Sequence, residues 1–296
     1  MSEFRSGFVT FVGRPNVGKS TLTNALVGEK IAITSSKPQT TRRAIRGIVN
    51  TEKAQIIIVD TPGLHRPRTL LGQRLNHLVE NTLGEVDVIG LCIPANEKIG
   101  PGDAFINEQI GAYRRAKLIV LVTKSETVSR DALAKQLVAV SELREWAAII
   151  PVSAVSGEQL DELKEVLGSL LPASNALYPT DMATEETIEE RICELIREAS
   201  LEDSREELPH SLAVTIDEMG KREDSNIFDI HANLWVERDS QKAIVIGKGG
   251  SRLKQIGSEA RVEIEKLLGH KVMLRIHVKV APDWQRDPKQ LGRLGM

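Results

Sequence analysis

Residues 13 to 20 read GRPNVGKS, and this octapeptide constrains the fold more than any other stretch of the chain. It fits the pattern G-x-x-x-x-G-K-[ST] and lies between an apolar run, FVTFV, and a helix-like run, TLTNALVG. Gly13 and Gly18 permit a tight backbone whose N–H groups point at phosphate oxygens. In such a loop Lys19 reaches the β- and γ-phosphates, and Ser20 supplies a hydroxyl to Mg²⁺. The strand-loop-helix setting therefore predicts a nucleotide site rather than a purely structural turn.

The first ~170 residues predict an α/β fold. Five apolar runs, FVTFVG, QIIIVD, DVIGLCI, KLIVLVT and AAIIPVS, alternate with helix-length segments. Continuous apolar runs of this kind are typical of a doubly wound, mostly parallel sheet with helices on both faces. The last helix of this domain is expected from about Gly157 to Leu171, because its leucines recur on one stripe.

A Pro/Ser/Asn-containing stretch, LLPASNALYP, marks a domain boundary. We expect a nucleotide-binding domain over residues 1–171, a linker over 172–184 and a second domain over 185–296 that ends in a basic tail. The patterns of the second domain predict the order α-β-β-α-α-β, from TEETIEERICELIREAS to the final strand KVMLRIHVKV.

The composition is that of an ordinary globular protein, with 41% hydrophobic and 27% charged residues. No apolar run approaches the ~18 residues of a membrane span, and the N-terminus lacks a cleavage region. We therefore expect a cytoplasmic protein, with peripheral contact at the inner face of the cell membrane as a further option. Cys92 and Cys193 are expected as buried free thiols, without disulfide or zinc.

The net charge of −2 conceals a strong asymmetry along the chain. Residues 181–239 carry 6 Lys/Arg against 18 Asp/Glu, whereas residues 240–296 carry 12 against 5. A basic C-terminal segment suggests a polyanionic partner, although the charge count taken alone favours a solvated charged surface.

A second phosphate motif follows the run QIIIVD. Asp60, at the end of this run, can hold Mg²⁺ through water, and the Gly63 amide can sense a γ-phosphate. Between the two motifs, SSKPQTTRRA is polar and is expected to be a mobile loop. Either Thr40 or Thr41 can add a hydroxyl to the metal, and we favour Thr41. Further on, PVSAVSG can place a backbone segment beside the base.

Together the stretches GRPNVGKST, PQTTR, DTPG and SA resemble the translation-factor-related small GTPases, in the branch that includes the Era-like proteins. Members of that branch join a P-loop GTPase domain to a C-terminal KH domain, and the resemblance covers almost the whole chain. One stretch departs from it. Where the family usually has Asn-Lys-x-Asp to read guanine, this chain has Thr123, Lys124, Ser125 and Glu126.

The resemblance implies that GTP or GDP and Mg²⁺ bind the first domain. It implies catalytic roles for Lys19, Thr41 and Gly63, and metal ligation by Ser20, Thr41 and Asp60. The residues expected around the nucleotide are Gly13, Arg14, Pro15, Asn16, Val17, Gly18, Lys19, Ser20, Thr21, Asp60, Thr61, Pro62, Gly63, Leu64, Thr123, Lys124, Ser125, Glu126, Ser153 and Ala154.

A G-x-x-G turn, VIGKGGSRLKQIG, lies between two helical segments of the second domain. A KH module clamps single-stranded RNA against such a turn, since glycines let phosphates approach and the next helix adds positive potential. Four isoleucine and valine side chains around the turn are expected as groove walls or as core. The expected RNA-binding residues are Ile246, Gly247, Lys248, Gly249, Gly250, Arg252 and Lys254.

The low aromatic content of 3% argues against RNA readers that stack bases on exposed rings. The resemblance implies an RNA near the 3′ end of the small-subunit ribosomal RNA, and hence a protein that assists assembly of the small ribosomal subunit as a monomer.

Turnover is expected to be slow, because Leu64 stands where Ras-like proteins have the glutamine that orients the attacking water. Asn16 lies where related GTPases hold K⁺, so K⁺ stimulation is a further expectation. Two other interpretations stay open. One is a P-loop ATPase, given the variant TKSE, and the other is a nucleotide-binding RNA chaperone with negligible turnover.

Overall fold

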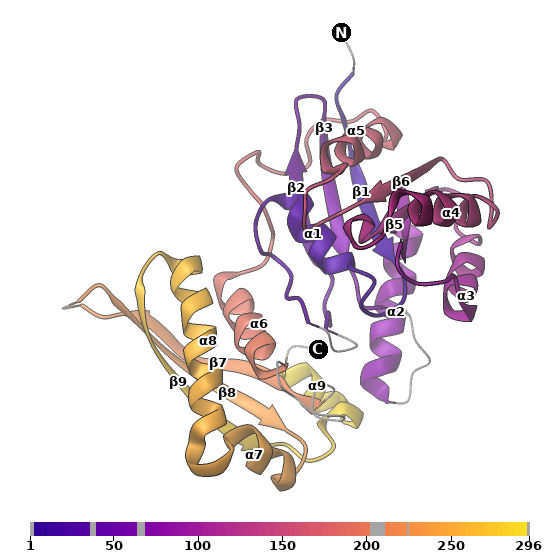
Figure 1. The fold of residues 1–296 in the computed structure, drawn as a ribbon. Coiled ribbons are helices and arrows are strands. Elements are labelled where there is room, and N and C mark those ends of the chain that lie inside the picture. The colour runs from indigo at the N-terminus through magenta and orange to yellow at the C-terminus, as the bar shows by residue number, and fades with distance from the viewer. Residues whose placement is uncertain (1–2, 36–39, 64–68, 202–210, 224, 295–296) are drawn as a thin grey trace. The chain divides into compact units, whose positions relative to one another are not determined.

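A computed structural model describes residues 3–35, 40–63, 69–201, 211–223 and 225–294 of the chain (Figure 1). These residues form two compact units. The first is built from Met1–Thr34, Thr41–Arg66 and Arg74–Glu185, and the second mainly from Glu186–Met296.

The first unit contains a six-stranded sheet in the order β2-β3-β1-β4-β5-β6. Its strands are β1 (Arg5–Val12), β2 (Ile45–Asn50), β3 (Ala54–Asp60), β4 (Val88–Pro94), β5 (Lys117–Thr123) and β6 (Ala148–Val152). All neighbouring strands are parallel except β2, which pairs antiparallel with β3. The predicted doubly wound, mostly parallel sheet is thus confirmed.

The edge strand β2 was not predicted. Its sequence IRGIVN carries an exposed arginine and an exposed asparagine, which interrupt the apolar run, and as an edge strand it pairs with a neighbour on one side. By contrast, every residue of β3 and β4 is buried, and these were the runs that the sequence made plain.

Helices cover both faces of the sheet (Figure 1). One face packs against α1 (Lys19–Val27) and α5 (Leu160–Leu170). The other packs against α2 (Leu70–Glu85), α3 (Pro101–Ile110) and α4 (Arg130–Ser141). The helix α5 begins later than the expected Gly157, because the Gly157 N–H donates to the Ser153 carbonyl and closes a turn first.

The arrangement of parallel strands decides where the motifs meet. The P-loop follows β1, the DTPG stretch follows β3, TKSE begins at the end of β5, and PVSA spans the end of β6. Because the carboxyl ends of parallel strands lie at one edge of a sheet, four segments far apart in sequence converge there.

The second unit has a three-stranded sheet in the order β7-β8-β9, with β7 antiparallel and β9 parallel to β8. Its elements are α6 (Ile188–Leu201), β7 (Ala213–Lys221), β8 (Ile227–Val236), α7 (Asp239–Ile246), α8 (Ser251–Leu268), β9 (Lys271–Val280) and α9 (Pro288–Arg293). The order through β9 is the predicted α-β-β-α-α-β.

The C-terminal residues, expected as a basic tail, are folded through Leu294. Trp284 is fully buried and donates from its indole nitrogen to the Ser211 carbonyl at 3.2 Å. Leu291, on α9, is also fully buried. Two large apolar side chains therefore hold this segment against the second unit, which a count of basic residues did not predict.

Of the two cysteines expected to be buried, Cys92 is fully buried and Cys193 only partly. Within the described residues, no helix is both long enough and apolar enough to cross a membrane.

Candidate nucleotide site and RNA interface

The P-loop backbone has the conformation that its glycines predicted. Gly13 and Gly18 have φ of 155° and 101°, and Asn16 also has a positive φ of 64°. At Gly13 a Cβ would lie 2.7 Å from the Cys92 carbonyl oxygen and 2.8 Å from Val17 Cγ2. The loop passes over β4 in van der Waals contact, and therefore a side chain at Gly13 would collide with its neighbours. From here the loop leads into α1.

Lys19, the first residue of α1, lies inside the P-loop. Its side chain is 8% exposed, and Nζ donates to the Gly13 and Arg14 carbonyls at 3.2 Å each. Burial lowers the pKa of Lys19, and the nearby Asp60 carboxylate opposes that shift. The ammonium group is thus held beneath the loop in a low-dielectric setting, where its interaction with a phosphate is strong.

Three oxygen atoms predicted as metal ligands lie together. Ser20 Oγ donates to Asp60 Oδ2 at 2.8 Å, Thr41 Oγ1 donates to the same oxygen at 3.2 Å, and the two hydroxyls are 3.1 Å apart. The structure therefore brings together α1, the segment before β2 and the end of β3. Of the two threonines considered as ligands, Thr41 has its hydroxyl in this cluster.

This cluster fits Mg²⁺. Asp60 is fully buried, and its second oxygen, Oδ1, has no hydrogen-bond partner. Burial raises the pKa of Asp60, while Ser20, Lys19 and Thr41 act in the opposite direction. A buried carboxylate with an unsatisfied oxygen and two hydroxyls beside it is the set of hard oxygen donors that Mg²⁺ takes, with waters and phosphates completing the octahedron.

Gly63 lies where a γ-phosphate sensor is needed. A Cβ placed on Gly63 would be 3.6 Å from Lys19 Nζ and 3.7 Å from the Gly13 carbonyl oxygen. The backbone of the DTPG stretch therefore passes beside the phosphate-binding lysine. Leu64, and with it the expectation for the attacking water, lies outside the described residues.

Arg14 has a different role from its P-loop neighbours. Its guanidinium bonds Asp103 at 2.8 Å and Glu97 at 2.9 Å, and both carboxylates raise its pKa. Asp103 lies at the start of α3 and is fully buried. The side chain of Arg14 thus anchors the loop to α3.

A cavity of about 160 Å³ lies beside the P-loop where the base is expected. Its lining comes from α1, from TKSE and from the end of β6: Gly18, Thr21, Leu22, Thr123, Lys124, Glu126, Val152, Ala154 and Val155. Six of these nine residues were predicted: Gly18, Thr21, Thr123, Lys124, Glu126 and Ala154. Leu22, Val152 and Val155 were missed, because apolar residues beside a motif are not distinguishable from core in a sequence.

Thr123 is tied to the P-loop. It is 4% exposed, and its hydroxyl donates to the Val17 carbonyl at 2.7 Å. A hydroxyl has one proton, so this bond leaves none to donate to a base. Thr123 therefore joins β5 to the P-loop but cannot also donate to a purine nitrogen.

Two loops border the base cavity: the first begins at the end of β5 and contains TKSE, and the second follows β6 and contains Ser153 to Glu158. Ser153 does not line the cavity but shapes this second base loop. Its Oγ accepts from the Ser156 N–H at 3.0 Å, and its N–H donates to the Glu158 carbonyl at 3.1 Å. Ala154 lines the cavity directly.

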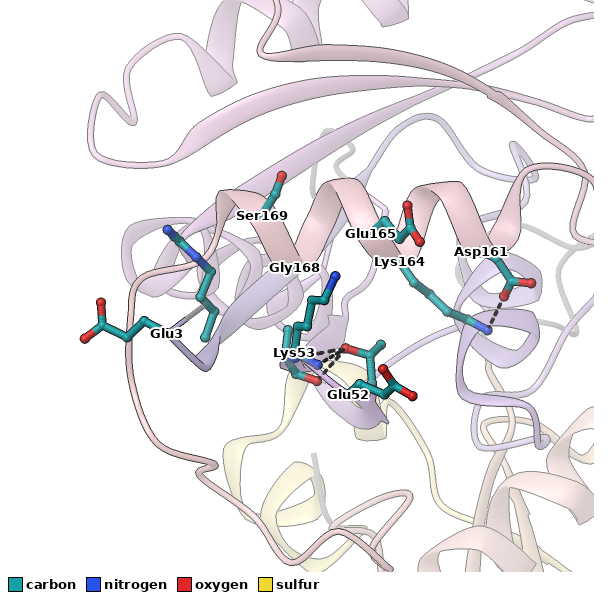
Figure 2. Close-up of a pocket in the computed structure, with 11 residues that line it drawn as sticks. Glu3, Glu52, Lys53, Asp161, Lys164, Glu165, Gly168 and Ser169 are labelled. Atoms are coloured by element: carbon teal, nitrogen blue, oxygen red, sulfur yellow. Dashed lines mark hydrogen bonds and ion pairs between the residues drawn. The ribbon is translucent and has the colours of Figure 1, made fainter. Parts of the chain in front are cut away.

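A second and larger cavity, of about 530 Å³, lies in the first unit between α5 and the residues that connect β2 to β3 (Figure 2). Charges of both signs line it, and Lys164 is paired with Asp161 at 3.0 Å. Its charged residues are Glu3, Arg5, Glu52, Lys53, Asp161, Lys164 and Glu165. With four acids against three bases and no glycine loop, this cavity is not built for a phosphate.

The G-x-x-G turn connects α7 to α8. Gly247, Gly249 and Gly250 have φ of 72°, 60° and 79°. A Cβ on Gly247 would lie 2.8 Å from Arg252 Cβ, whereas Gly249 and Gly250 face open space. Gly247 is required by packing, and the other two leave room for a ligand backbone.

Positive side chains surround this turn. Lys248 and Lys254 are exposed, and Arg252 is partly exposed. Of the expected groove walls, Val245 and Ile256 are core residues, Ile246 is partly buried and Ile244 is 49% exposed. The turn and the start of α8 therefore present cations and open glycines, and the end of α7 adds one exposed aliphatic side chain, Ile244.

These observations define the class of protein. A doubly wound domain with a P-loop, an Asp60 metal cluster and a base cavity is followed by a unit of KH topology with a G-x-x-G turn. Family comparison agrees: residues 8–144 match the family described as 50S ribosome-binding GTPase, and residues 207–285 match the KH domain. The chain is a P-loop GTPase joined to a KH domain.

Relatives along the full length specify the family. The chain is 66% identical over 298 residues to GTPase Era of Mycobacterium sp. (strain KMS), with 100% of each sequence covered. It is 65% identical to GTPase Era of Mycolicibacterium smegmatis (strain ATCC 700084 / mc(2)155), with the same coverage. The chain belongs to the Era family of GTPases.

Solved structures agree with this assignment. A crystal structure of Era in complex with MgGDPNP and nucleotides 1506–1542 of 16S ribosomal RNA matches with a TM-score of 0.94 and 37% identity, covering 99% of each chain. A crystal structure of a single-residue variant of Aquifex aeolicus Era, bound to GDP and AlF4⁻, matches with the same TM-score, identity and coverage.

Proposed function

We propose that this chain is a GTP-hydrolysing switch that binds small-subunit ribosomal RNA near its 3′ end and assists assembly of the small ribosomal subunit. The observation that carries the proposal is the convergence of four loops at one edge of the first sheet, in a chain whose second unit has a G-x-x-G turn. The related Era protein solved with 16S ribosomal RNA supports the choice of RNA.

The residues divide the work of phosphate binding. Lys19 supplies a buried cation to the β- and γ-phosphates, and the backbone N–H groups at the start of α1 add positive potential. Ser20, Thr41 and Asp60 would hold Mg²⁺, which when bound neutralises charge on the phosphates. Gly63 would place its N–H beside the γ-phosphate, so that its loop responds to the difference between GTP and GDP.

Intrinsic hydrolysis should be slow, because a leucine at position 64 can neither donate nor accept a hydrogen bond to the attacking water. Backbone groups or a partner must then order that water. The further proposal of K⁺ stimulation rests on Asn16, which lies in the P-loop where related GTPases hold K⁺. Single-turnover hydrolysis measured in KCl and in NaCl tests this proposal, and equal rates in the two salts would contradict K⁺ stimulation.

Guanine is selected mainly by Glu126 in this proposal. In the usual motif an Asp carboxylate accepts from guanine N1–H and from the exocyclic amine, a pattern that adenine cannot satisfy. Glu126 lines the base cavity and keeps this carboxylate on an arm one methylene longer. Lys124 would lie against the base. Thr123 keeps the link to Val17 but loses the donation to the base that an Asn amide makes.

Titration of the full chain with GDP and ADP tests this assignment. We expect selective but weak GDP binding, and a Thr123→Asn, Glu126→Asp double variant should bind GDP about 10- to 100-fold more tightly. Equal affinity for GDP and ADP, or tighter ADP binding, would overturn the choice of guanine and favour a P-loop ATPase.

The competing chaperone function is tested separately. In single-turnover measurements, the small ribosomal subunit should accelerate phosphate release if the chain is a switch. Nucleotide-dependent RNA binding without any phosphate release would instead favour an RNA chaperone. We further propose that the chain acts as a cytoplasmic monomer, in which residues 172–184 form the linker between the domains. Sedimentation of the purified chain tests the monomer, and sedimentation with lipid vesicles tests peripheral contact with the membrane.

A further inference from the structure

The two loops of the base cavity are joined by a hydrogen bond between side chains. Ser125 Oγ, in the loop after β5, donates to Glu158 Oε2, in the loop after β6, at 3.0 Å. Ser125 is 5% exposed, although it lies in a surface loop. Neither residue lines the cavity, so this bond acts on the loops and not on a base.

Glu158 is itself fixed to the second loop. Its carbonyl accepts from the Ser153 N–H at 3.1 Å, and the Gly157 N–H donates to the Ser153 carbonyl at 3.0 Å. One end of Glu158 therefore closes the turn that presents Ala154, while its carboxylate reaches the other loop.

The loop after β5 is equally constrained. Lys124 has a positive φ of 58°, and Ser125–Thr127 forms one 3₁₀ turn. The Lys124 carbonyl accepts from the Thr127 N–H at 3.0 Å and from Thr127 Oγ1 at 2.7 Å. Among the described residues of this turn, only the side chain of Ser125 forms a hydrogen bond with the second base loop.

Glu126 follows Ser125 directly and lines the cavity. A glutamate has one more rotatable bond than the aspartate that usually occupies this position, so its carboxylate needs a more firmly held backbone to be presented in one place. Anchoring Ser125 holds the peptide from which Glu126 projects.

We infer that Ser125 and Glu158 are positioning residues that determine guanine selectivity by holding Glu126 against the exocyclic amine of the base. The inference rests on the proposed function, in which Glu126 reads guanine.

The test compares GDP with inosine diphosphate, which lacks that amine, by titration of the full chain. The ratio of the two affinities isolates the contact between Glu126 and the amine. In Glu158→Ala this ratio should fall by about tenfold, the scale of one charge-assisted hydrogen bond. A residue that only stabilises the fold would weaken both nucleotides equally and leave the ratio unchanged.

Three further variants sharpen the result. Glu158→Gln keeps an acceptor oxygen and should keep the ratio near that of the parent. Ser125→Ala should lower the ratio as Glu158→Ala does, and combining the two should lower it no further, because they break the same bond. Glu162→Ala is the charge control: it removes an exposed carboxylate on the neighbouring α5 and should leave the ratio unchanged.

The outcomes separate the two proposals. A parent chain without preference for GDP over ADP would overturn the assignment of guanine to TKSE. A parent that prefers GDP over ADP but has the same GDP-to-inosine diphosphate ratio as Glu158→Ala and Ser125→Ala would overturn only the positioning role. A ratio lowered in both, and kept in Glu158→Gln, supports it.

Discussion

The P-loop and the G-x-x-G turn are both glycine loops that precede a helix, yet their surroundings differ. Gly13 and Gly18 in one, and Gly249 and Gly250 in the other, all have a positive φ. A Cβ on Gly13 would collide with the β4 backbone, whereas a Cβ on Gly249 or Gly250 would meet nothing within 4 Å.

The cations of the two loops differ in the same way. Lys19 is 8% exposed, and burial lowers its pKa, while Lys248 is exposed. The P-loop is thus a cradle already formed by the protein, and the G-x-x-G turn is an open surface that an RNA backbone must complete. Each loop has one crowded glycine, Gly13 or Gly247, and open ones, such as Gly18 or Gly249. Substitution at the crowded Gly13 should therefore cost more than substitution at the open Gly249.

The largest expected effect is on stability, from Gly13→Ala. The added methyl must displace the Cys92 carbonyl or Val17, in a backbone conformation that alanine disfavours. Overpacking and strain together should cost about 3 kcal/mol of unfolding free energy. Gly249→Ala, with strain alone, should cost about 1 kcal/mol.

Chemical denaturation of the full chain measures both variants. The transition of the first unit is identified as the one that GDP shifts. Equal losses in Gly13→Ala and Gly249→Ala would contradict the contrast between a crowded and an open glycine position.

Next in size is the loss of phosphate binding in Lys19→Ala. Removing the buried cation should weaken GTP by at least ~2 kcal/mol, or about 30-fold. Lys248→Ala is the matched control and should leave GTP affinity unchanged, because its lysine belongs to the other loop. Unchanged GTP titration in Lys19→Ala would remove the P-loop assignment.

A smaller effect is expected on RNA. The double variant Lys248→Asp, Gly249→Asp should weaken binding of single-stranded RNA by about tenfold, through repulsion of phosphate and strain at a glycine position. The salt dependence of binding should also become shallower, by about 0.7 in slope for each lost phosphate contact. If the double variant bound RNA as tightly as the parent chain, the RNA site would lie elsewhere. The affinity for GTP is the control and should not change.

The smallest effect lies away from both loops. Arg46 and Glu185 form an ion pair at 2.6 Å, but their side chains are 43% and 36% exposed. A hydrogen bond from Tyr178, and then Arg46, lower the pKa of Glu185. A lowered carboxylate pKa stabilises the fold at neutral pH, and the contribution is lost as pH falls through that pKa.

Solvent screening keeps the contribution of this pair small. Arg46→Gln should therefore cost about 0.5 kcal/mol at neutral pH and nothing in acid. Urea denaturation at the two pH values measures it. If Arg46→Gln lowered the free energy of unfolding as much as Gly13→Ala, the exposure of a side chain would not predict how much its removal destabilises this chain.

Where a motif has its own local chemistry, the sequence predicted the structure closely. The P-loop dihedrals follow from Gly13 and Gly18, and the buried strands β3 and β4 follow from uninterrupted apolar runs. The last strand, β9, has the predicted bounds. The edge strand β2 was not predicted, because its two polar residues interrupt the apolar run. The buried Trp284 was not predicted, because its partner Ser211 lies far away in the sequence.

The sequence alone determined which residues the nucleotide site needs, because glycine conformation, apolar runs and the order of elements are local properties. Only the tertiary structure decided what several of those residues do. Arg14 turns to α3, Thr123 uses its single proton on Val17, and Ser125 reaches Glu158. Each of these bonds joins residues between 33 and 106 positions apart, and parallel strands alone bring such residues to one edge of a sheet.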